Sequence, residues 1–258
     1  MIERLPPGWK PASSPVVINM YSLLMTSASS RPNVRRFSIL YEGGTRAARS
    51  LDPELVLKVF ESDVQIYVGI LAQRRIFVHA GVVEWHGQAI VIPGRSMSGK
   101  TTLTAELVRA GATYYSDEYA VLDERGRVHP YPRQLGMRTP GAAEQTKVRA
   151  EALGGRVGVK PLPVGMVVVS RYEAGARWRP RRLSAARGAL ELLANTVPAR
   201  ARPEESLTSI QQAVMNATVF KGRRGEAKET VEFILQSLSR PSSVTVSAAP
   251  EALRHQDY

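Results

Sequence analysis

Runs of apolar residues, and the polar turns between them, predict a β-rich first third. Val16–Met20 and Phe37–Tyr41 have the density of β-branched and aromatic residues that is typical of strands. A second apolar run follows at Leu55–Phe60. Residues 63–73 fit either a helix or a strand, and the spacing of their apolar positions favours a helix.

The middle of the chain has the clearest pattern. Residues 76–83 and Ala89–Ile92 predict two strands, and His86-Gly87 between them predicts the turn of a hairpin. A helix is expected after the second strand, because apolar positions from Leu103 onward share one helical face until Gly111. Further strands are expected at Thr113–Tyr115, Tyr119–Leu122 and Val164–Val169, and a mobile loop at residues 138–160.

The last third of the sequence predicts helices. One candidate is Ala186–Ala194, and another is Glu204–Asn216, with Leu207, Ile210 and Val214 on one face. A third helix is expected between Gly225 and Pro241. Together with the hairpin, these elements predict an α/β fold in which helices flank a mixed β-core.

Length and composition are compatible with a single domain. The chain has 258 residues and is 43% hydrophobic, which is enough for one sizeable core. We assign residues 1–240 to one domain, with residues 1–35 as an extension that contains a strand, and residues 241–258 to a flexible tail. The absence of cysteine excludes disulfides, thiolate metal sites and a cysteine nucleophile.

The sequence gives no sign of a membrane or secretory segment. No apolar stretch approaches the roughly 18–20 residues of a membrane span, and MIERLPPGWK is unlike a signal peptide. We therefore expect a cytoplasmic protein without a membrane partner.

The charge is strongly basic, at +12, from 35 Lys and Arg against 23 Asp and Glu. No basic run exceeds two residues, and no nucleic-acid-binding motif is present, so a nucleic-acid partner is not expected. A genome that prefers arginine codons is the simpler interpretation of the excess. The charge also suits a phosphate site or an acidic partner.

One motif predicts chemistry directly. The sequence GRSMSGKT matches the phosphate-binding pattern G-x-x-x-x-G-K-[ST] and lies between an expected strand and an expected helix. Glycines let backbone N–H groups approach phosphate oxygens, and the helix dipole favours an anion at the N-terminus. Lys100 can reach the terminal phosphates, and the Thr101 hydroxyl can bind Mg²⁺. The candidate nucleotide-binding residues are Gly94, Arg95, Ser96, Met97, Ser98, Gly99, Lys100, Thr101 and Thr102.

An acidic pair follows at a suitable place. Asp117 and Glu118 come after the expected helix and a short strand, so a returning strand can bring them beside the phosphate loop. A carboxylate there can hold Mg²⁺ or accept a proton from an attacking hydroxyl. The alternative is a solvated turn. A lone histidine such as His79, inside an apolar strand, is more often a core residue, and Arg133 and Arg224 are more often solvated than phosphate ligands.

Residues 76–135 resemble the core of the HPr kinase/phosphorylase family. The shared features are the strand FVHAGVV, the loop GRSMSGKT, the helix that follows and the acidic pair in SDEYAVLD; WRPRRLS and RGEA add a looser similarity to HPr-kinase-like proteins encoded beside peptide natural-product genes. The resemblance implies the phosphoenolpyruvate-carboxykinase fold and an active site that includes His79. It also implies that an acid of the pair, Asp117 or Glu118, deprotonates the acceptor serine.

From these features we expect an ATP- and Mg²⁺-dependent kinase acting on a serine of a peptide or small protein, such as a lasso-peptide precursor. Glu118 stands where the family has a second Asp, and the family's later glycine-rich signature is missing. A nucleotide-binding regulator without transferase activity and a small-molecule kinase therefore stay open. The family's assembly into oligomers leaves self-association open as well.

Overall fold

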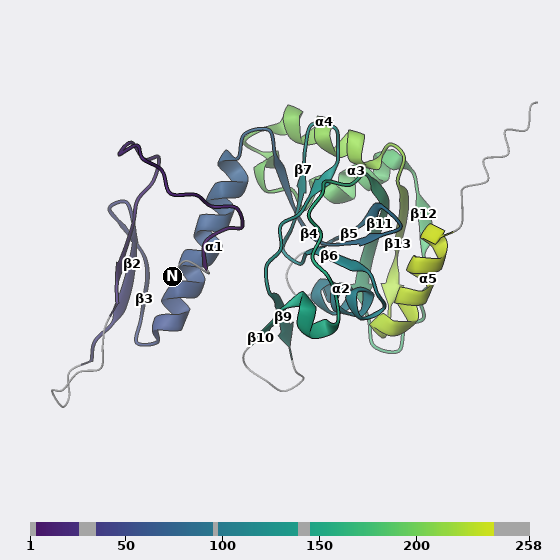
Figure 1. The fold of residues 1–258 in the computed structure, drawn as a ribbon, viewed down its shortest axis with the longest axis horizontal. Coiled ribbons are helices and arrows are strands. Elements are labelled where there is room, and N and C mark those ends of the chain that lie inside the picture. The colour runs from purple at the N-terminus through teal and green to yellow at the C-terminus, as the bar shows by residue number, and fades with distance from the viewer. Residues whose placement is uncertain (1–3, 26–34, 95–97, 139–144, 240–258) are drawn as a thin grey trace, which may run out of the picture.

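The main body of the protein is built on one mixed β-sheet. The computed structural model describes residues 4–25, 35–94, 98–138 and 145–239. In this part of the chain, eight strands form a sheet in the order β12-β13-β11-β5-β4-β7-β8, with β6 also paired to β4 (Figure 1). The strands are β4 (Ile76–Trp85), β5 (Gln88–Pro93), β6 (Thr113–Ser116), β7 (Tyr119–Leu122), β8 (Val128–His129), β11 (Val164–Tyr172), β12 (Arg181–Leu183) and β13 (Thr218–Arg224).

Strand directions confirm a mixed α/β fold. β4 and β5 form the antiparallel hairpin that the sequence predicts, turning at His86 and Gly87, which both have positive φ. β11 runs parallel to β5 on one side and to β13 on the other. β6 and β7 both pair with β4 in the antiparallel sense. The sheet therefore joins a parallel part to an antiparallel part, and β5 lies where the two meet.

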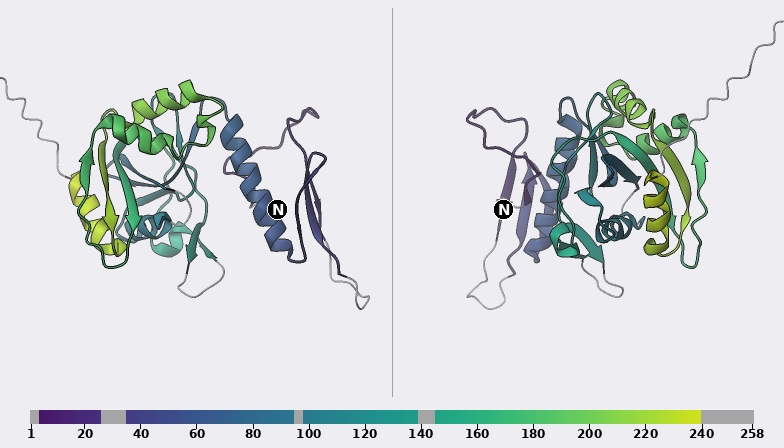
Figure 2. Two further views of the ribbon diagram at one scale, coloured as in Figure 1. Left: turned by 180° about the vertical axis from the view of Figure 1, so that it is seen from behind. Right: turned by 45° about the vertical axis from the view of Figure 1, so that its right-hand side comes forward.

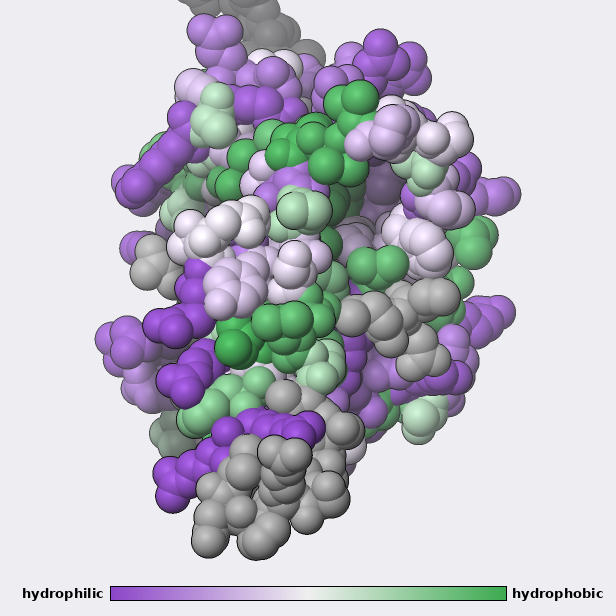
Figure 3. Space-filling model, turned by 90° about the vertical axis from the view of Figure 1, so that its left-hand side faces the viewer, coloured by the Kyte–Doolittle hydropathy of each residue, from purple (hydrophilic) through white to green (hydrophobic). Residues whose placement is uncertain are grey.

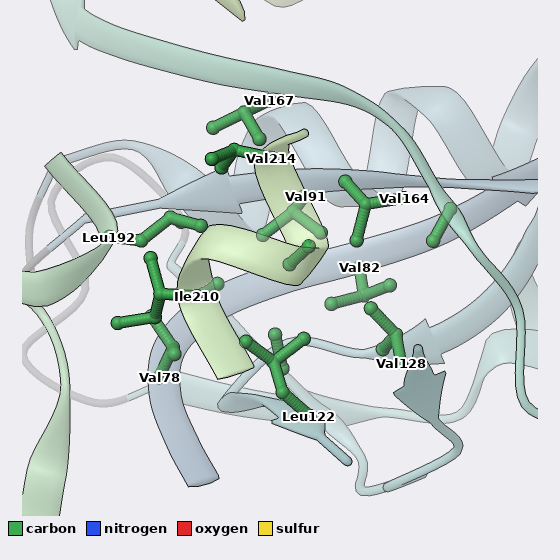
Figure 4. Packing of buried hydrophobic residues seen from close by; sticks show 14 of the residues in the cluster. Val78, Val82, Val91, Leu122, Val128, Val164, Val167, Leu192, Ile210 and Val214 are labelled. Atoms are coloured by element: carbon green, nitrogen blue, oxygen red, sulfur yellow. The ribbon is translucent and has the colours of Figure 1, made fainter. Parts of the chain in front are cut away.

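Helices cover both faces of this sheet. Successive side chains of β4 point to opposite faces of the sheet, so Val82 faces one helical layer and Val83 the other. On the first face α3 (Ala185–Leu193) and α4 (Pro203–Val214) bury Leu192, Ile210 and Val214 against the strands (Figure 4). On the second face lie α2 (Lys100–Arg109) and α5 (Ala227–Ser239).

A smaller unit precedes the main body. β1 (Tyr21–Leu24), β2 (Ser38–Glu42) and β3 (Thr45–Ser50) form an antiparallel sheet, and α1 (Pro53–Leu71) lies between this sheet and the main body (Figures 1 and 2). Leu40, Val56 and Phe60 form its core. Figure 3 looks onto this side of the molecule and shows apolar side chains across its middle, with hydrophilic ones around them.

The structure corrects one expectation for this smaller unit and confirms another. The first strand is Tyr21–Leu24, whereas Val16–Met20 is not a strand and exposes its apolar side chains. Residues 63–71 are helical, as their spacing favours, and they continue the single helix α1 that also contains the apolar run at residues 55–60. Asp52 caps this helix by accepting a hydrogen bond from the Glu54 backbone N–H, and Pro53 favours its first turn.

The second half needs further corrections. Residues 138–160 were expected to form a loop, but they include β10 (Gln145–Val148), which pairs with β9 (Leu135–Arg138), and a 3-10 turn at Ala150–Leu153. The last third is not purely helical, because β12 and β13 lie within it. In α4, Leu207 is exposed, and the buried face carries small residues beside Ile210 and Val214.

One expectation concerns residues beyond the described ranges. The expected tail, residues 241–258, lies outside them. Within them, no helix combines the length and apolar composition needed to cross a membrane.

Candidate functional site

The loop that carries the phosphate-binding motif connects β5 to α2. Gly94 directly follows β5, and its backbone N–H donates to the carbonyl of His79 on β4 at 3.2 Å. Gly99 precedes α2 with a φ of 83°, and no side chain caps the helix. Gly99 has no side chain with which to cap the first N–H groups of α2, and an uncapped helix N-terminus is the arrangement that binds anions. Arg95, Ser96 and Met97 lie outside the described residues.

Arg224 fixes the start of α2 from the end of β13. Its guanidinium Nη2 donates to the carbonyl of Gly99 at 2.6 Å, and Nη1 donates to the carbonyl of Gly225 at 3.0 Å. A Cβ on Gly99 would approach that guanidinium to 2.4 Å, so this position needs glycine for both its backbone angle and its neighbour. The expectation of a solvated Arg224 is wrong, because the residue is 1% exposed.

Glycine also sets the distance between α2 and the sheet. Gly81 is on the face of β4 that α2 covers, and a Cβ there would lie 2.2 Å from Thr104 Oγ1 and 3.2 Å from Lys100 Cγ. His79 is two residues earlier on the same strand and so lies on the same face. The strand thus places His79 toward the start of α2.

The acidic pair occupies the turn between β6 and β7. Lys100 Nζ donates to the backbone carbonyl of Asp117 at 2.9 Å, which confirms that the turn lies beside the start of α2. Ser116 Oγ accepts the backbone N–H groups of Glu118 and Tyr119 and holds the turn in shape. Asp117 is buried and Glu118 is exposed. The two acids therefore meet very different environments.

The buried carboxylate of Asp117 is incompletely paired. Its Oδ1 is buried without a hydrogen-bond partner. Burial raises the pKa of Asp117 to about 6, although Lys100 and a hydrogen bond from Thr101 both favour the charged form. A buried carboxylate with a free oxygen is suited to bind a cation or to accept a proton.

His79 lies next to the acidic turn. Its ring is 4.6 Å from the ring of Tyr119, measured between centroids, and β4 pairs it directly with that residue. Burial lowers the pKa of His79, and Lys100 lowers it further, whereas the Glu118 carboxylate and backbone oppose this shift. The lowered pKa makes the imidazole neutral at pH 7.

A cavity of about 340 Å³ opens where these elements meet. It is lined by Gly99, Lys100, Thr101 and Thr102 from the start of α2, by Asp117 and Glu118, and by Gln134, Gly136, Arg138 and Gln145. The structure thus gathers six predicted residues around one space. His79, Gly94 and Ser98 are close in the fold but do not line it.

The far wall of the cavity was missed by the sequence reasoning. Gln134, Gly136, Arg138 and Gln145 belong to β9, β10 and the residue before them, within or next to the segment expected to be a loop. The strands are short and polar, so alternation gave no signal. Arg133 is the neighbour that the sequence did single out, but it pairs with Glu61 on α1 at 3.1 Å and does not line this cavity.

The residues present fit a magnesium ion that arrives with a nucleotide. In the described part of the chain, no group of three or more His, Asp or Glu side chains is arranged to hold a metal ion. A nucleotide-bound Mg²⁺ takes most ligands from phosphates and water and needs only one or two from the protein. The Thr101 hydroxyl and the Asp117 carboxylate, which interact with each other, can supply these.

Comparison with known proteins gave no assignment. No protein-family model matches the chain, and no curated protein matches it significantly.

Proposed function

We propose that this protein is an ATP- and Mg²⁺-dependent kinase that transfers the γ-phosphoryl group to a serine hydroxyl of a peptide or small protein. The same proposal includes phosphate binding by the motif at residues 94–101 and kinship with the HPr-kinase-like fold. The observation that carries it is the meeting of Lys100, Thr101, Asp117 and Glu118 around one cavity at an uncapped helix N-terminus. This set contains an ammonium that can pair with phosphate, a hydroxyl that can bind Mg²⁺, and two carboxylates. Phosphoryl transfer needs groups of these kinds.

Each group has a role that follows from its position. The uncapped N–H groups of α2 and the ammonium of Lys100 bind and orient the nucleotide phosphates. To do so, Lys100 exchanges its hydrogen bond to the Asp117 carbonyl for hydrogen bonds to phosphate oxygens. Thr101 and Asp117 would hold Mg²⁺, which supplies neutralising charge when bound. Arg224 keeps the start of α2 in place through the Gly99 carbonyl.

The chemical step needs one proton acceptor. The serine Oγ forms a bond to the γ-phosphorus while the bond from that phosphorus to the β–γ bridging oxygen breaks, and ADP leaves. The serine proton passes to a carboxylate, either Asp117 or Glu118, which both line the cavity. His79 is neutral and lies against Tyr119 beside the acidic turn, where it can orient that turn.

Removing the Lys100 charge tests the proposal. Purified protein is incubated with ATP, Mg²⁺ and a library of serine-containing peptides, and phosphopeptides are detected by mass spectrometry. We expect Lys100→Ala to lower transfer on the order of 10²-fold or more, because it removes a charge aimed at the phosphates. Lys228→Ala is the matched control, since Lys228 is an exposed lysine in the first turn of another helix, α5.

The outcomes separate the candidate functions. Transfer within a factor of two of wild type in Lys100→Ala, with an unchanged melting temperature, would contradict the phosphate-site assignment. Nucleotide binding without phosphorylation of any peptide would instead favour a regulator. Phosphate appearing on a sugar or amino acid would indicate a small-molecule kinase.

A further inference from the structure

A second cavity lies next to the candidate active site and is strongly cationic. It has a volume of about 570 Å³ and lies between the N-terminal segment, which contributes Arg4 and Trp9, and the chain around Arg133. Lys147 and Arg149 complete its cationic lining. A space of this size accommodates several side chains of a bound molecule.

The positive charges of this cavity are only partly neutralised. Glu61 on α1 accepts from Arg4 Nη1 at 2.6 Å, from Arg133 Nη2 at 3.1 Å and from Lys147 Nζ at 3.2 Å. Glu54 also pairs with Arg4, at 2.8 Å. Four cations against two carboxylates leave an excess of two positive charges. Among the described residues, no carboxylate forms an ion pair with the exposed Arg149.

Arg133 presents a donor that the protein does not use. Its side chain is 14% exposed, and its Nη1 is buried without a hydrogen-bond partner. An unpaired buried donor on a charged group is unfavourable, and an incoming oxygen anion would remove that cost. Because the guanidinium is charged, a carboxylate forms a stronger hydrogen bond with it than a neutral acceptor does.

The two cavities share a wall. Gln134 lines both of them, and it directly follows Arg133 in the chain. Gly136 and Lys147 are paired between β9 and β10, and each lines one of the two cavities. An extended peptide advances about 3.3 Å per residue. A hydroxyl beside Asp117 and a carboxylate beside Arg133 can therefore belong to the same short peptide.

We propose that this cationic cavity binds the acidic segment of the acceptor, so that the substrate is a peptide with Asp or Glu a few residues from the phosphorylated serine. That the peptide carries a phosphorylated serine rests on the proposed function. That it carries acidic residues rests on the cavity alone. Trp9 is 43% exposed and lines the cavity, so it offers an apolar surface that a peptide can cover and a small anion cannot.

Paired peptides and paired variants test this directly. Two fluorescein-labelled peptides carry the same serine, one with flanking Glu and the other with Gln, and anisotropy measures their binding to the full chain without nucleotide. We expect the acidic peptide to bind at least about tenfold more tightly. Arg149→Glu should abolish this preference. Arg187→Glu, an equal charge change on the exposed surface of α3, should preserve it.

A second variant and a second ligand complete the test. Arg133→Met should also remove the preference, with its melting temperature reported beside the wild type. Binding of ATP to Arg149→Glu should stay at the wild-type level, because Arg149 does not line the cavity at α2. Equal affinity for the Glu and Gln peptides, in a protein that binds ATP, would overturn the acidic-peptide inference and leave the kinase proposal standing.

The remaining outcomes are equally decisive. A preference for the acidic peptide in a protein that neither binds ATP nor phosphorylates would keep the cavity assignment and reject the kinase. Full displacement of the peptide by succinate or inorganic phosphate at comparable concentration would overturn the peptide as occupant. Tighter binding of a single-stranded oligonucleotide through Arg149 would do the same.

Discussion

Asp117 is a carboxylate whose surroundings disfavour its charge, so it lowers the stability of the folded protein at neutral pH. Burial raises its pKa to about 6, from an ordinary value of 3.8. The folded state therefore binds a proton more tightly than the unfolded chain does. As the pH rises from about 4 to about 6, the unfolded state loses its proton first, and the free energy of unfolding falls.

Asp117→Asn is therefore expected to change activity and stability in opposite directions. Transfer should fall on the order of 10²–10⁴-fold, because the substitution removes a metal ligand and a proton acceptor. In metal-free buffer at pH 8, the free energy of unfolding should rise by up to about 3 kcal/mol, and this gain should vanish near pH 4. Denaturant titrations across this pH range measure it.

Glu118→Gln is the matched comparison for Asp117→Asn. Glu118 is exposed, so its replacement should change the stability little. Its effect on transfer shows whether it or Asp117 accepts the serine proton. A destabilised Asp117→Asn protein at pH 8 would contradict the assigned burial cost.

His79 provides a second residue-scale prediction. Its ring packs on Tyr119 and its charge neighbours are Lys100 and Glu118. His79→Ala should reduce turnover more than it reduces stability, because the side chain is only half-buried and lies at the site. A purely structural residue would show a loss of roughly 1–3 kcal/mol in unfolding free energy with turnover retained. Thermal melts and rate measurements on the same preparations distinguish the two.

At the scale of elements, the sequence best predicted the strands that are buried on both faces and the helices whose apolar positions recur periodically. β4, β5 and β11 are covered by helices on both faces, so they read as continuous apolar runs with clear ends. The loop between β5 and α2 was found because its glycines, Lys100 and Thr101 have fixed spacing. Of these residues, Gly99, Lys100 and Thr101 line the cavity of the candidate site.

Elements with polar sequences escaped prediction. β13 reads TVFKGRR, yet it lies inside the sheet between β11 and β12. Its last residue, Arg224, is buried because it bonds two backbone carbonyls, and nothing local to the sequence reveals those partners. The pair of strands β9 and β10 was missed for a similar reason. Its residues pair with each other and line the cavity, and the local sequence reveals neither contact.

The contact between α2 and β4 can be tested as a unit. Gly81→Ala places a Cβ 2.2 Å from Thr104 Oγ1, so α2 must shift away from the strand. We expect a loss of roughly 1–3 kcal/mol in unfolding free energy and weaker ATP binding, because Lys100 and Thr101 move with the helix. Denaturation and calorimetric titration measure these two effects.

A double mutant supplies the control for Gly81→Ala. Thr104→Ala removes the hydroxyl that the new Cβ would meet, so Gly81→Ala in that background should recover most of the lost stability and affinity. Gly44→Ala, in the β2–β3 turn with open space around it, should have little effect. Additive losses in the double mutant would show that the close contact with Thr104 does not set this spacing.

At the scale of the whole molecule, α1 connects the small sheet to the main body by two kinds of contact. Near its C-terminal end, Gly69 lies against Phe77 on β4 and Val197, where a Cβ would meet them at 3.4 and 3.2 Å. Near its middle, Glu61 gathers Arg133 and Lys147 from the main body. The apolar contact brings the helix close, and the charged contact fixes its direction relative to the second cavity.

Glu61→Gln should loosen this attachment. The carboxylate is 7% exposed and bonds three cations, and its removal leaves Arg133, whose side chain is 14% exposed, without its counter-charge. Removing one partner of a buried ion pair lowers the free energy of unfolding by about 3 kcal/mol. Glu54 has a side chain that is 55% exposed and pairs with Arg4, so Glu54→Gln should lower it by less than about 1 kcal/mol. Limited proteolysis should cut residues 4–71 faster in Glu61→Gln than in Glu54→Gln, and denaturation should rank the two in the same order. Equal effects of the two substitutions would mean that the apolar contact at Gly69 alone holds α1, and that the position of Arg133 does not depend on Glu61.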